Sequence, residues 1–405
     1  MAVVIDKAGR DVLALAEQAK ADTVPSKKKP VVIVSMAAED AAFASILFEK
    51  GAAEISEGAC VAAAACNADI VFYDTDDSRA IVLSEAADGN ATVLIGEGSP
   101  VLREESALFR AMAGKTVRCE LEERSFPTEG WNERPTLVLD AETAYWLAKA
   151  NRGEEQGKLL LSINTESVEL HSFALDTPLD EVFRALAVAT DKPILAGGIP
   201  GKFINAGACS TETLSYTHEF DTIQSYTAET CMAETGRLLT EKNAETSCGK
   251  CVLCREGSWQ YKAIFNDICT GHGSRTDFKL IEDIGELIAI GAFCDFGRDM
   301  VRIPVTLAEL CKAELEAHIV RKTCPASICS AFSNYAIDPS LCDGCGDCLD
   351  ECPEEAIEGK PGFISMIDES LCEKCGACSE VCPQDAIISG GKFRVPKKMT
   401  RVGRF

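Results

Sequence analysis

The sequence is poor in several features that would indicate particular functions. It has only four histidines, which leaves little room for catalysis by imidazole groups. Lys and Arg number 40 against 64 Asp and Glu, and the net charge of −24 disfavours binding to nucleic acid or to anionic membranes. No apolar run approaches the ~20 residues that a membrane-spanning helix needs. Residues 1–10 lack the pattern of a signal peptide, so we expect a cytoplasmic protein without a transmembrane segment.

Cysteine, in contrast, is abundant, with 21 residues in a chain of 405. Thiols stay reduced in the cytoplasm, so cysteines in this number indicate metal binding rather than disulfides. The chain is long enough for about two to four domains. Its hydrophobic content of 46% is sufficient for packed cores.

The C-terminal part contains one cysteine pattern twice. The first run has Cys342, Cys345, Cys348 and Cys352-Pro353, and the second has Cys372, Cys375, Cys378 and Cys382-Pro383. This C-x2-C-x2-C-x3-C-P spacing is that of bacterial two-cluster ferredoxins, in which the last cysteine of each run serves the cluster of the other run. We therefore expect one [4Fe-4S] cluster on Cys342, Cys345, Cys348 and Cys382, and another on Cys372, Cys375, Cys378 and Cys352. Zinc knuckles are the alternative, but they rarely show this spacing.

The rest of the chain is predicted to form three further domains. Residues 1–150 are expected to be an α/β domain, with a helix at 11–20, strands at 31–34, 70–73, 92–95 and 136–139, and helices at 38–54 and 102–113. Residues 151–226 are expected to be a small β-grasp (ubiquitin-like) module, with a hairpin at 159–163 and 168–173, a helix from Thr177-Pro178 and a strand at 193–196. The glycine-rich turn at 197–201 is interpreted as a tight turn rather than a phosphate site.

Residues 227–330 are expected to be a helix bundle that carries a third cysteine set. An apolar stripe of helical spacing consists of Phe278, Leu280, Ile281, Ile284, Leu287, Ile288 and Phe293. Cys248, Cys251 and Cys254 open a helix, and Cys294 follows forty residues after Cys254. These four thiols suit a cubane cluster, although the number of ligands alone also permits zinc. Residues 331–405 then form the two-cluster domain.

A basic tail ends the chain, formed by Lys392, Arg394, Lys397, Lys398, Arg401 and Arg404. It is either a solvated tail or a segment that docks on an acidic partner.

The third cysteine set carries a resemblance to a known family. Residues 245–257 and Phe293-Cys294-Asp295-Phe296-Gly297 resemble the cluster domain of the flavin-bearing, NADH-oxidising subunit of respiratory complex I. With the two appended clusters, the chain resembles the beta subunit of electron-bifurcating [FeFe]-hydrogenases and related NAD-linked formate dehydrogenases. Weaker similarity extends to residues 95–97, 129–136, 141–143 and 197–201. The resemblance implies that Cys248, Cys251, Cys254 and Cys294 also bind a [4Fe-4S] cluster.

The segments that bind FMN and NADH in this family are altered here. The family's Gly-Arg-Gly-Gly-Ala-Gly-Phe-Pro loop corresponds to residues 8–14, which contain a single glycine, and its Asn-Ala-Asp-Glu segment corresponds to residues 35–40. Asp140 stands where the family has an asparagine, and its carboxylate would repel a flavin phosphate. We interpret the chain as one that kept the fold and lost the flavin. The alternative is that FMN persists through other contacts.

A fourth metal site is predicted between the bundle and the two-cluster domain. His318, Cys324 and Cys329 offer nitrogen and sulfur ligands within twelve residues, which suits a tetrahedral zinc. Hydrogenase beta subunits carry a similar stretch, and this resemblance implies a structural zinc. Cys231, Cys269 and Cys311 are candidates for the missing fourth ligand. The alternative is a pair of core cysteines beside a histidine at a helix end. Four other cysteines are interpreted as small buried hydrophobic residues, namely Cys60, Cys66, Cys119 and Cys209.

These observations predict an iron–sulfur electron-transfer subunit with three [4Fe-4S] clusters, a candidate zinc and no catalytic residue of its own. Its expected partners are subunits of a hydrogenase, a formate dehydrogenase or another reductase, and ferredoxin. The alternative is an FMN-dependent NAD(P)H dehydrogenase subunit of an electron-bifurcating hydrogenase or formate dehydrogenase. A structural scaffold role for residues 1–150 is compatible with either function.

Overall fold

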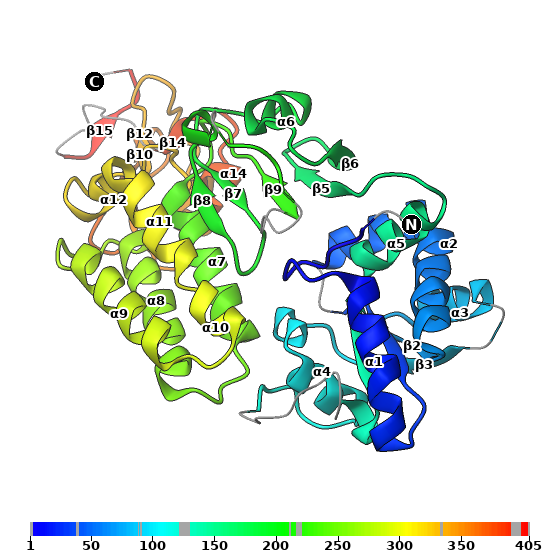
Figure 1. Ribbon diagram of the computed structural model, residues 1–405. Coiled ribbons are helices and arrows are strands. Elements are labelled where there is room, and N and C mark those ends of the chain that lie inside the picture. The colour runs from blue at the N-terminus through cyan, green and yellow to red at the C-terminus, as the bar shows by residue number, and fades with distance from the viewer. Residues whose placement is uncertain are drawn as a thin grey trace. The chain divides into compact units, whose positions relative to one another are not determined.

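A computed structural model (Figure 1) describes residues 3–37, 40–87, 89, 91–120, 130–209, 212–215, 221–332, 335–389 and 398–403. It divides into two compact units. The first comprises Met1–Ala228, Leu239–Tyr261 and Lys279–Leu310, and the second comprises Glu229–Leu238, Lys262–Phe278 and Cys311–Phe405. The predicted division into four domains stays a prediction.

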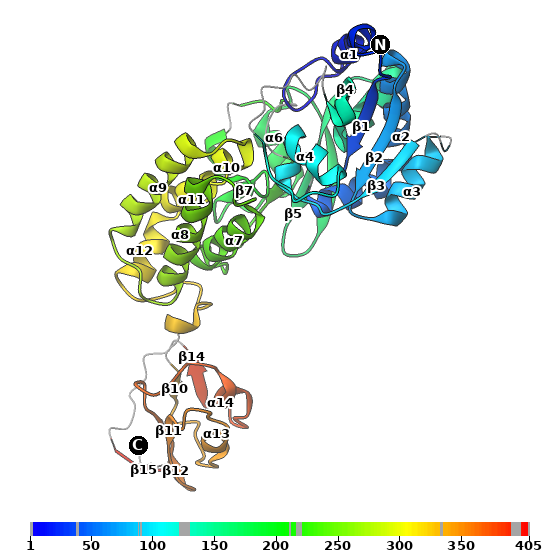
Figure 2. The same cartoon turned by 90° about the horizontal axis from the view of Figure 1, so that it is seen from below.

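The N-terminal part of the first unit is built on a parallel sheet. Its strands are β1 (Val31–Ser35), β2 (Asp69–Asp74), β3 (Ala91–Ile95) and β4 (Thr136–Asp140), in the order β3-β2-β1-β4, as seen side by side in Figure 2. Val31 pairs with Asp69 on one side and with Thr136 on the other. All residues of β1 are buried, because a central parallel strand is covered on both faces. The four predicted strands are therefore present, each with slightly different ends.

Helices surround this sheet in the order of the chain. They are α1 (Val12–Ser26), α2 (Ala41–Cys66), α3 (Asp77–Ala86), α4 (Glu105–Met112) and α5 (Ala141–Asn151), with short 3-10 turns η1 (Pro100–Arg103) and η2 (Trp131–Glu133). The sequence analysis ended the second helix at residue 54, which is wrong, because the alanine-rich continuation is a good helix former. The predicted starting residue, Ala38, lies outside the described residues. The sequence analysis also missed α3.

Two glycines allow α2 to pack closely against α5. A Cβ on Gly58 would lie 1.8 Å from the backbone oxygen of Ala144, and one on Gly51 would lie 2.8 Å from the Tyr145 ring. Gly51 also has non-helical backbone angles, with φ −146° and ψ 22°, which kinks the helix there. Because these two positions lack a side chain, the long helix α2 can pack directly against α5.

A second sheet follows, with the strand order β6-β5-β9-β7-β8. The strands are β5 (Gly157–Ile163), β6 (Val168–Ala174), β7 (Ile194–Ala196), β8 (Lys202–Ile204) and β9 (Thr222–Gln224), and α6 (Leu179–Ala185) and η3 (Ala206–Cys209) lie between them in sequence. Asn164 closes the predicted hairpin, because its side-chain oxygen accepts hydrogen bonds from the amides of Glu166 and Ser167 at 2.8 Å. The side chain of Cys209 lies outside the described residues.

A succession of helices comes next in sequence, and part of it belongs to each unit. These are α7 (Met232–Thr246), α8 (Val252–Cys269), α9 (Asp277–Gly291), α10 (Asp295–Asp299), α11 (Arg302–Leu310) and α12 (Lys312–Ile319). The predicted apolar stripe on α9 is only partly a core face. Ile281, Ile284 and Ile288 are buried, whereas Leu280, Leu287 and Phe293 are exposed by 43%, 54% and 47%. The predicted stripe was too wide, because it combined the buried face of the helix with a neighbouring face that is exposed.

The C-terminal region of the second unit consists of two interlocked halves. After η4 (Ser330–Phe332), β10 (Tyr335–Ile337) pairs with β14 (Ile387–Ser389), β11 (Ile357–Glu358) with β13 (Met366–Ile367), and β12 (Phe363–Ile364) with β15 (Thr400–Arg401). The short helices α13 (Asp347–Asp350) and α14 (Ala377–Glu380) occupy equivalent places. The Asp338 amide donates to the Ala386 carbonyl and the Asp368 amide to the Ala356 carbonyl, both at 2.8 Å. The sequence repeat is therefore a structural repeat.

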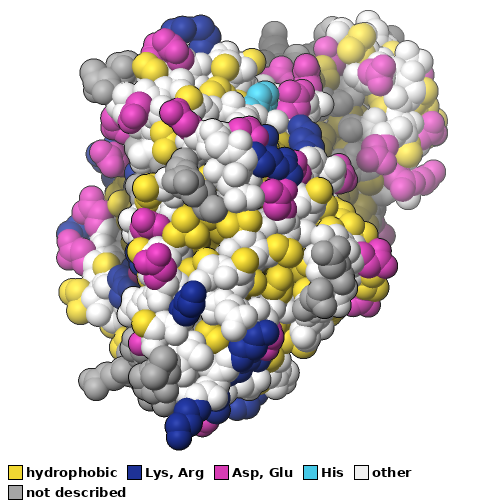
Figure 3. Space-filling view, turned by 45° about the vertical axis from the view of Figure 1, so that its right-hand side comes forward, with side chains coloured by type: hydrophobic (Ala, Val, Ile, Leu, Met, Phe, Trp, Pro, Cys, Tyr) yellow, Lys and Arg dark blue, Asp and Glu magenta, His cyan; other side chains and the backbone are white. Residues whose placement is uncertain are grey.

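The surface is charged, and its basic tail is described only in part. Acidic side chains are spread over the face shown in Figure 3. Arg401 lies over the Phe363 ring at 5.6 Å, and Lys398 is exposed. The other predicted tail residues, Lys392, Arg394, Lys397 and Arg404, lie outside the described residues. Among the helices that the structure describes, none combines the length and the apolar character that crossing a membrane requires.

Candidate metal centres

One cavity of the C-terminal region collects cysteines from both sequence runs. It is lined by Cys342, Cys345 and Cys348 of the first run and by Cys382 of the second. Ile337 and Ile387 cover it from the paired strands. The Ala386 amide donates a hydrogen bond to Cys382 Sγ at 3.3 Å. Four thiols that face one small cavity, with backbone amides aimed at sulfur, fit a [4Fe-4S] cluster.

A second cavity repeats this arrangement with the roles of the runs exchanged. It is lined by Cys372, Cys375 and Cys378 of the second run and by Cys352 of the first. The Ala356 amide donates to Cys352 Sγ at 3.3 Å, matching the bond at Cys382 in the first cavity. The structure thus places the two predicted ligand sets together.

Local backbone geometry explains why closely spaced cysteines can face one cavity. Gly346 and Gly376 stand two residues before Cys348 and Cys378, with φ angles of 100° and 85°. Only glycine adopts such angles without strain, so each turns the chain sharply between two cysteines. Burial raises the pKa of the Cys378 thiol to about 11. Iron must therefore displace a tightly held proton when the site fills.

The helical part of the first unit contains the third cysteine set. Cys248 and Cys251 stand in the loop before α8, Cys254 lies in its first turn, and Cys294 caps the start of α10 by accepting a hydrogen bond from the Gly297 amide at 3.4 Å. A Cβ on Gly297 would lie 3.4 Å from Cys254 Sγ and 3.6 Å from Cys294 Sγ. The sulfurs of Cys254 and Cys294, which are far apart in sequence, therefore both lie close to the backbone of Gly297, where no side chain intervenes. Burial raises the pKa of Cys254 to about 11.

A fifth cysteine lies at this site, a position that the sequence did not predict for it. Cys119 is 7% exposed, as expected for a small buried residue, and its side chain lies beside those of Cys248 and Cys294. Its carbonyl accepts a hydrogen bond from Lys250 Nζ at 2.7 Å. The contact with Cys119 lowers the pKa of Cys248 to about 5. Residue 119 has no spacing relation to the later cysteines, so no signal in the sequence marks it.

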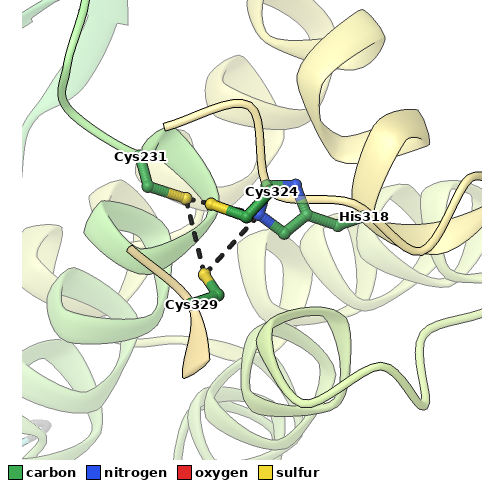
Figure 4. A group of neighbouring side chains, drawn as sticks. All are labelled: Cys231, His318, Cys324 and Cys329. Carbon is green, nitrogen blue, oxygen red and sulfur yellow. Dashed lines mark hydrogen bonds between the residues drawn. The ribbon is translucent and has the colours of Figure 1, made fainter. Parts of the chain in front are cut away.

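The fourth site lies in the second unit and brings together the three predicted residues and Cys231. Figure 4 shows Cys231, His318, Cys324 and Cys329 pointing toward one another. Their ligand atoms all lie within 4.8 Å of one another. Cys231 immediately precedes α7, and His318 is fully buried on α12. Among the three candidates for a fourth ligand, Cys231 is therefore the one that completes this group.

The distances in this group match those of a tetrahedral zinc site. With bonds of about 2.3 Å to sulfur and 2.0–2.1 Å to nitrogen, two sulfurs of such a site lie about 3.8 Å apart, and sulfur and nitrogen about 3.6 Å. Cys231 Sγ is 3.6 Å from Cys329 Sγ and 3.3 Å from His318 Nε2, and Cys329 Sγ is 3.6 Å from the same nitrogen. His318 Nδ1 lies 2.9 Å from the Glu314 carbonyl. Nδ1 must carry the hydrogen there, which leaves Nε2 free to bind a metal.

The region that corresponds to the flavin loop is closed on itself. The amides of Ala8 and Arg10 both donate to Asp6 Oδ1, at 3.0 and 2.8 Å, and those of Leu13 and Ala14 donate to Asp11 Oδ1. These amides are therefore already paired with side-chain carboxylates. Helix α1 itself starts later than expected, at Val12, with Asp11 as its N-cap. Asp140 is likewise occupied as the N-cap of α5, because it accepts from the Thr143 amide at 2.8 Å.

A buried ion network lies behind this loop. The side chains of Lys158 and Glu142 are fully buried and lie 3.4 Å apart, and Lys158 Nζ also donates to Asp221 Oδ1 at 2.6 Å. Lys7 adds contacts to Asp221 at 3.0 Å and Glu142 at 3.7 Å. Although burial opposes it, these ammonium groups lower the pKa of Asp221. Lys158 and Asp221 give no recognisable signal in the sequence, because they lie far apart and belong to no motif.

Two cavities remain near the carboxyl ends of the parallel strands. The smaller, of about 180 Å³, lies at β1 and β4 and is lined by Lys7, Arg10, Ser35 and Asp140 among others. Ligands of open α/β sheets bind at such a point, where the strand order reverses. The buried Ser35 hydroxyl has no hydrogen-bond partner there among the residues that the structure describes. The larger cavity, of about 620 Å³, extends to Cys248, and Asp40, Glu97, Lys242 and Glu245 contribute its charged groups.

Two parts of the chain match known protein families. Residues 236–318 match the NADH-ubiquinone oxidoreductase-F iron-sulfur binding region, and residues 341–386 match the 4Fe-4S dicluster domain. The chain is 28% identical over 309 residues to the NADP-reducing hydrogenase subunit HndC of Solidesulfovibrio fructosivorans, covering 69% of this chain and 62% of that protein. It is 26% identical over 268 residues to the F subunit of NADH-quinone oxidoreductase of Streptomyces coelicolor, covering 60% of each.

The fold is also similar to a solved structure. In the H2-reduced NAD+-reducing [NiFe]-hydrogenase, one chain matches with a TM-score of 0.68 and 19% identity, over 78% of this chain and 61% of that chain. The protein thus spans less than two thirds of the length of these relatives. The resemblance predicted from the sequence is confirmed: the chain carries an NADH-ubiquinone oxidoreductase-F iron-sulfur binding region followed by a 4Fe-4S dicluster domain, and it is homologous to HndC and to the F subunit of NADH-quinone oxidoreductase.

Proposed function

We propose that this protein is an electron-transfer subunit that relays single electrons through three [4Fe-4S] clusters within a larger oxidoreductase complex. The observation that best supports this proposal is that twelve cysteines fall into three sets of four. The sets are Cys248/Cys251/Cys254/Cys294, Cys342/Cys345/Cys348/Cys382 and Cys372/Cys375/Cys378/Cys352. A bound [4Fe-4S] cluster accepts and donates one electron at a time. The protein supplies the thiolates, the amides that donate to them, and the burial that excludes water.

Each set is supported by the chemistry of its surroundings. The amides of Ala356, Ala386 and Gly297 donate to Cys352, Cys382 and Cys294. Hydrogen bonds to cluster sulfurs raise reduction potential, so these amides contribute to setting the potential of each site. At the bundle site, the Cys119 thiol lies beside two of the ligands and offers one S–H group that can donate to a ligand sulfur.

The zinc site has a structural role in this proposal. Zinc on Cys231, His318, Cys324 and Cys329 would join the start of α7, the end of α12 and the segment that leads into the two-cluster domain. A closed set of four protein ligands leaves no open position for substrate, which is typical of structural rather than catalytic zinc.

We further propose that the subunit does not bind FMN. A flavin phosphate requires free backbone amides. Here the amides of residues 8, 10, 13 and 14 already donate hydrogen bonds to the carboxylates of Asp6 and Asp11. Asp140 adds negative charge at the carboxyl end of β4, and Lys7 lies 3.7 Å from the buried Glu142 and 3.0 Å from Asp221. The N-terminal α/β part then serves as a scaffold.

The second sheet and the exposed apolar side chains near α8 and α9 also have roles in this proposal. The strand order β6-β5-β9-β7-β8, with β5 and β9 parallel and the remaining pairs antiparallel, supports a β-grasp module. Exposed apolar side chains on and beside α8 and α9, which include Val252, Leu253, Leu287, Ile290 and Phe293, support binding to other subunits. A hydrogenase, formate dehydrogenase or other reductase, and ferredoxin, are the proposed partners, and the cytoplasm is the proposed compartment.

The alternative function, an FMN-dependent NAD(P)H dehydrogenase subunit, is favoured by one observation. The cavity of about 620 Å³ that reaches Cys248 is large enough for a cofactor, and the buried Ser35 hydroxyl lies in the neighbouring cavity. Two measurements on anaerobically purified protein separate the functions. The electron-transfer proposal expects about twelve irons per chain, no flavin and no bleaching of the clusters by NADH. Stoichiometric FMN together with NADH-driven bleaching would establish the alternative, and a reproducible count of about eight irons would remove the third cluster.

A further inference from the structure

A second set of metal-ligand residues lies directly beside the zinc site and shares one residue with it. Glu234, Cys269 and Cys329 each place one ligand atom within 4.8 Å of the other two. Cys269 and Cys329 are 5% and 6% exposed, and Glu234 is half-buried. The sequence predicts Cys269 only as a candidate for the fourth zinc ligand, a place that Cys231 occupies. The two sets together therefore contain more ligands than one tetrahedral ion can use.

The three residues come from different elements and are held in place. Glu234 lies in the first turn of α7, where its amide donates to Cys231 Sγ at 3.5 Å. Arg237 holds its carboxylate through hydrogen bonds of 2.7 and 2.9 Å. Cys269 is the last residue of α8, and Cys329 directly precedes η4. A metal ion here would join the ends of two helices to the loop of the zinc site.

The position of Cys329 suits a thiolate that bridges two ions. On one side, its sulfur lies 3.6 Å from both Cys231 Sγ and His318 Nε2. On the other side, it lies within 4.8 Å of Cys269 and of Glu234. A metal with bonds of about 2.3 Å to sulfur and 2.0–2.2 Å to oxygen requires about 3.5–3.8 Å between its ligand atoms. The distances between the ligand atoms of the second set therefore have to shorten by no more than about 1.3 Å.

We propose that Glu234, Cys269 and Cys329 bind a second divalent cation, bridged to the first through the Cys329 sulfur. Two thiolates and one carboxylate favour a borderline or soft ion of the zinc class over magnesium or calcium. Three protein ligands leave a position for water. The inference rests on the proposed zinc site, and its test separates the two.

The full-length protein is reconstituted anaerobically with iron, sulfide and Zn2+, desalted, and analysed for both metals. The wild type should hold two zinc ions per chain, and Cys269→Ser and Glu234→Gln should each hold one, with the iron content unchanged. Cys311→Ser is the matched control, because Cys311 is equally buried at 6% and belongs to neither ligand set, and it should keep two. Zinc absorption spectroscopy of the wild type should show a second zinc at about 3.5–4 Å, and Cys269→Ser should lack this signal.

The possible outcomes are distinct. The wild type could hold one zinc that His318→Ala loses and Cys269→Ser keeps. This result would overturn the proposal of a second ion and support the first zinc site. Zero zinc would overturn both. Two zinc ions that persist in both Cys269→Ser and Glu234→Gln would show that the second ion binds elsewhere. The absorption spectrum of the wild type decides the question even where a variant fails to fold.

Discussion

The crossed ligation proposed for the two C-terminal clusters makes a sharp prediction. Cys348 and Cys352 are four residues apart in the same run, yet they line different cavities. Cys352→Ala should therefore destroy the cluster of the second run, because it removes one of the four thiols around that cavity. Iron should fall from about twelve to about eight per chain, a loss equal to the content of one cubane. A single variant does not reveal which cluster was lost, so a second substitution is needed.

Cys345 and Cys375 provide matched second substitutions, because they hold equivalent positions in the two runs and both are exposed. Cys352→Ala combined with Cys375→Ala removes two ligands of the same cavity, so the double variant should still contain about eight irons. Cys352→Ala combined with Cys345→Ala removes one ligand from each cavity, and about four irons should remain. The difference between the double variants is one whole cluster, well above the error of metal analysis.

The opposite pattern would refute the reasoning. If Cys352 served its own run, the combination with Cys345→Ala would keep about eight irons and that with Cys375→Ala about four. Because β10 and β14 link the two halves, loss of one cluster could also release the other. The single variants Cys345→Ala and Cys375→Ala control for this, since each should keep about eight irons.

Three further predictions follow from other parts of the molecule. His318→Ala should release the zinc bound at Cys231 while the iron content measured beside it stays the same, because His318 belongs to none of the three cluster ligand sets. Cys119→Ala should keep all iron but lower the reduction potential of the bundle cluster in an EPR-monitored titration, because it removes an S–H donor that lies beside two ligand sulfurs. An unchanged potential would make Cys119 a packing residue. Lys158→Met should destabilise the first unit by about 3–5 kcal/mol, because it leaves buried carboxylates unpaired. Removing the charge of the more exposed Lys149 is the control and should cost only about 0–1 kcal/mol. Thermal melts measure both changes in stability.

The sequence predicted best those features that depend on spacing and local composition. The four parallel strands were recognisable as short β-branched runs, because buried parallel strands are apolar throughout. The cysteine sets of the C-terminal region were recognisable because a turn of fixed length presents thiols to one cavity. In both cases, a short stretch of chain carries the whole signal.

What the sequence did not reveal depends on contacts between distant segments. Cys119 joins the bundle cysteines and Cys231 joins His318 only through the fold. The continuation of α2 beyond residue 54 was missed because its alanines and glycines lack the large apolar residues that mark a core face, although they pack closely on α5. The predicted stripe on α9 failed for the opposite reason, since large apolar residues there are exposed.

The proposed loss of the flavin concerns a loop whose amides are satisfied by the protein itself. In the loop, the Asp6 carboxylate takes the place of an anionic ligand, because it accepts the amides of Ala8 and Arg10. Restoring glycines alone would therefore not reopen the site, since Asp6 would still bind these amides. Behind the loop, Lys7 and Lys158 neutralise Glu142 and Asp221, so the buried acids do not depend on a cofactor. Asp6→Ala frees two amides without touching this network, and if FMN then still fails to bind, the repulsion at Asp140 is the stronger barrier.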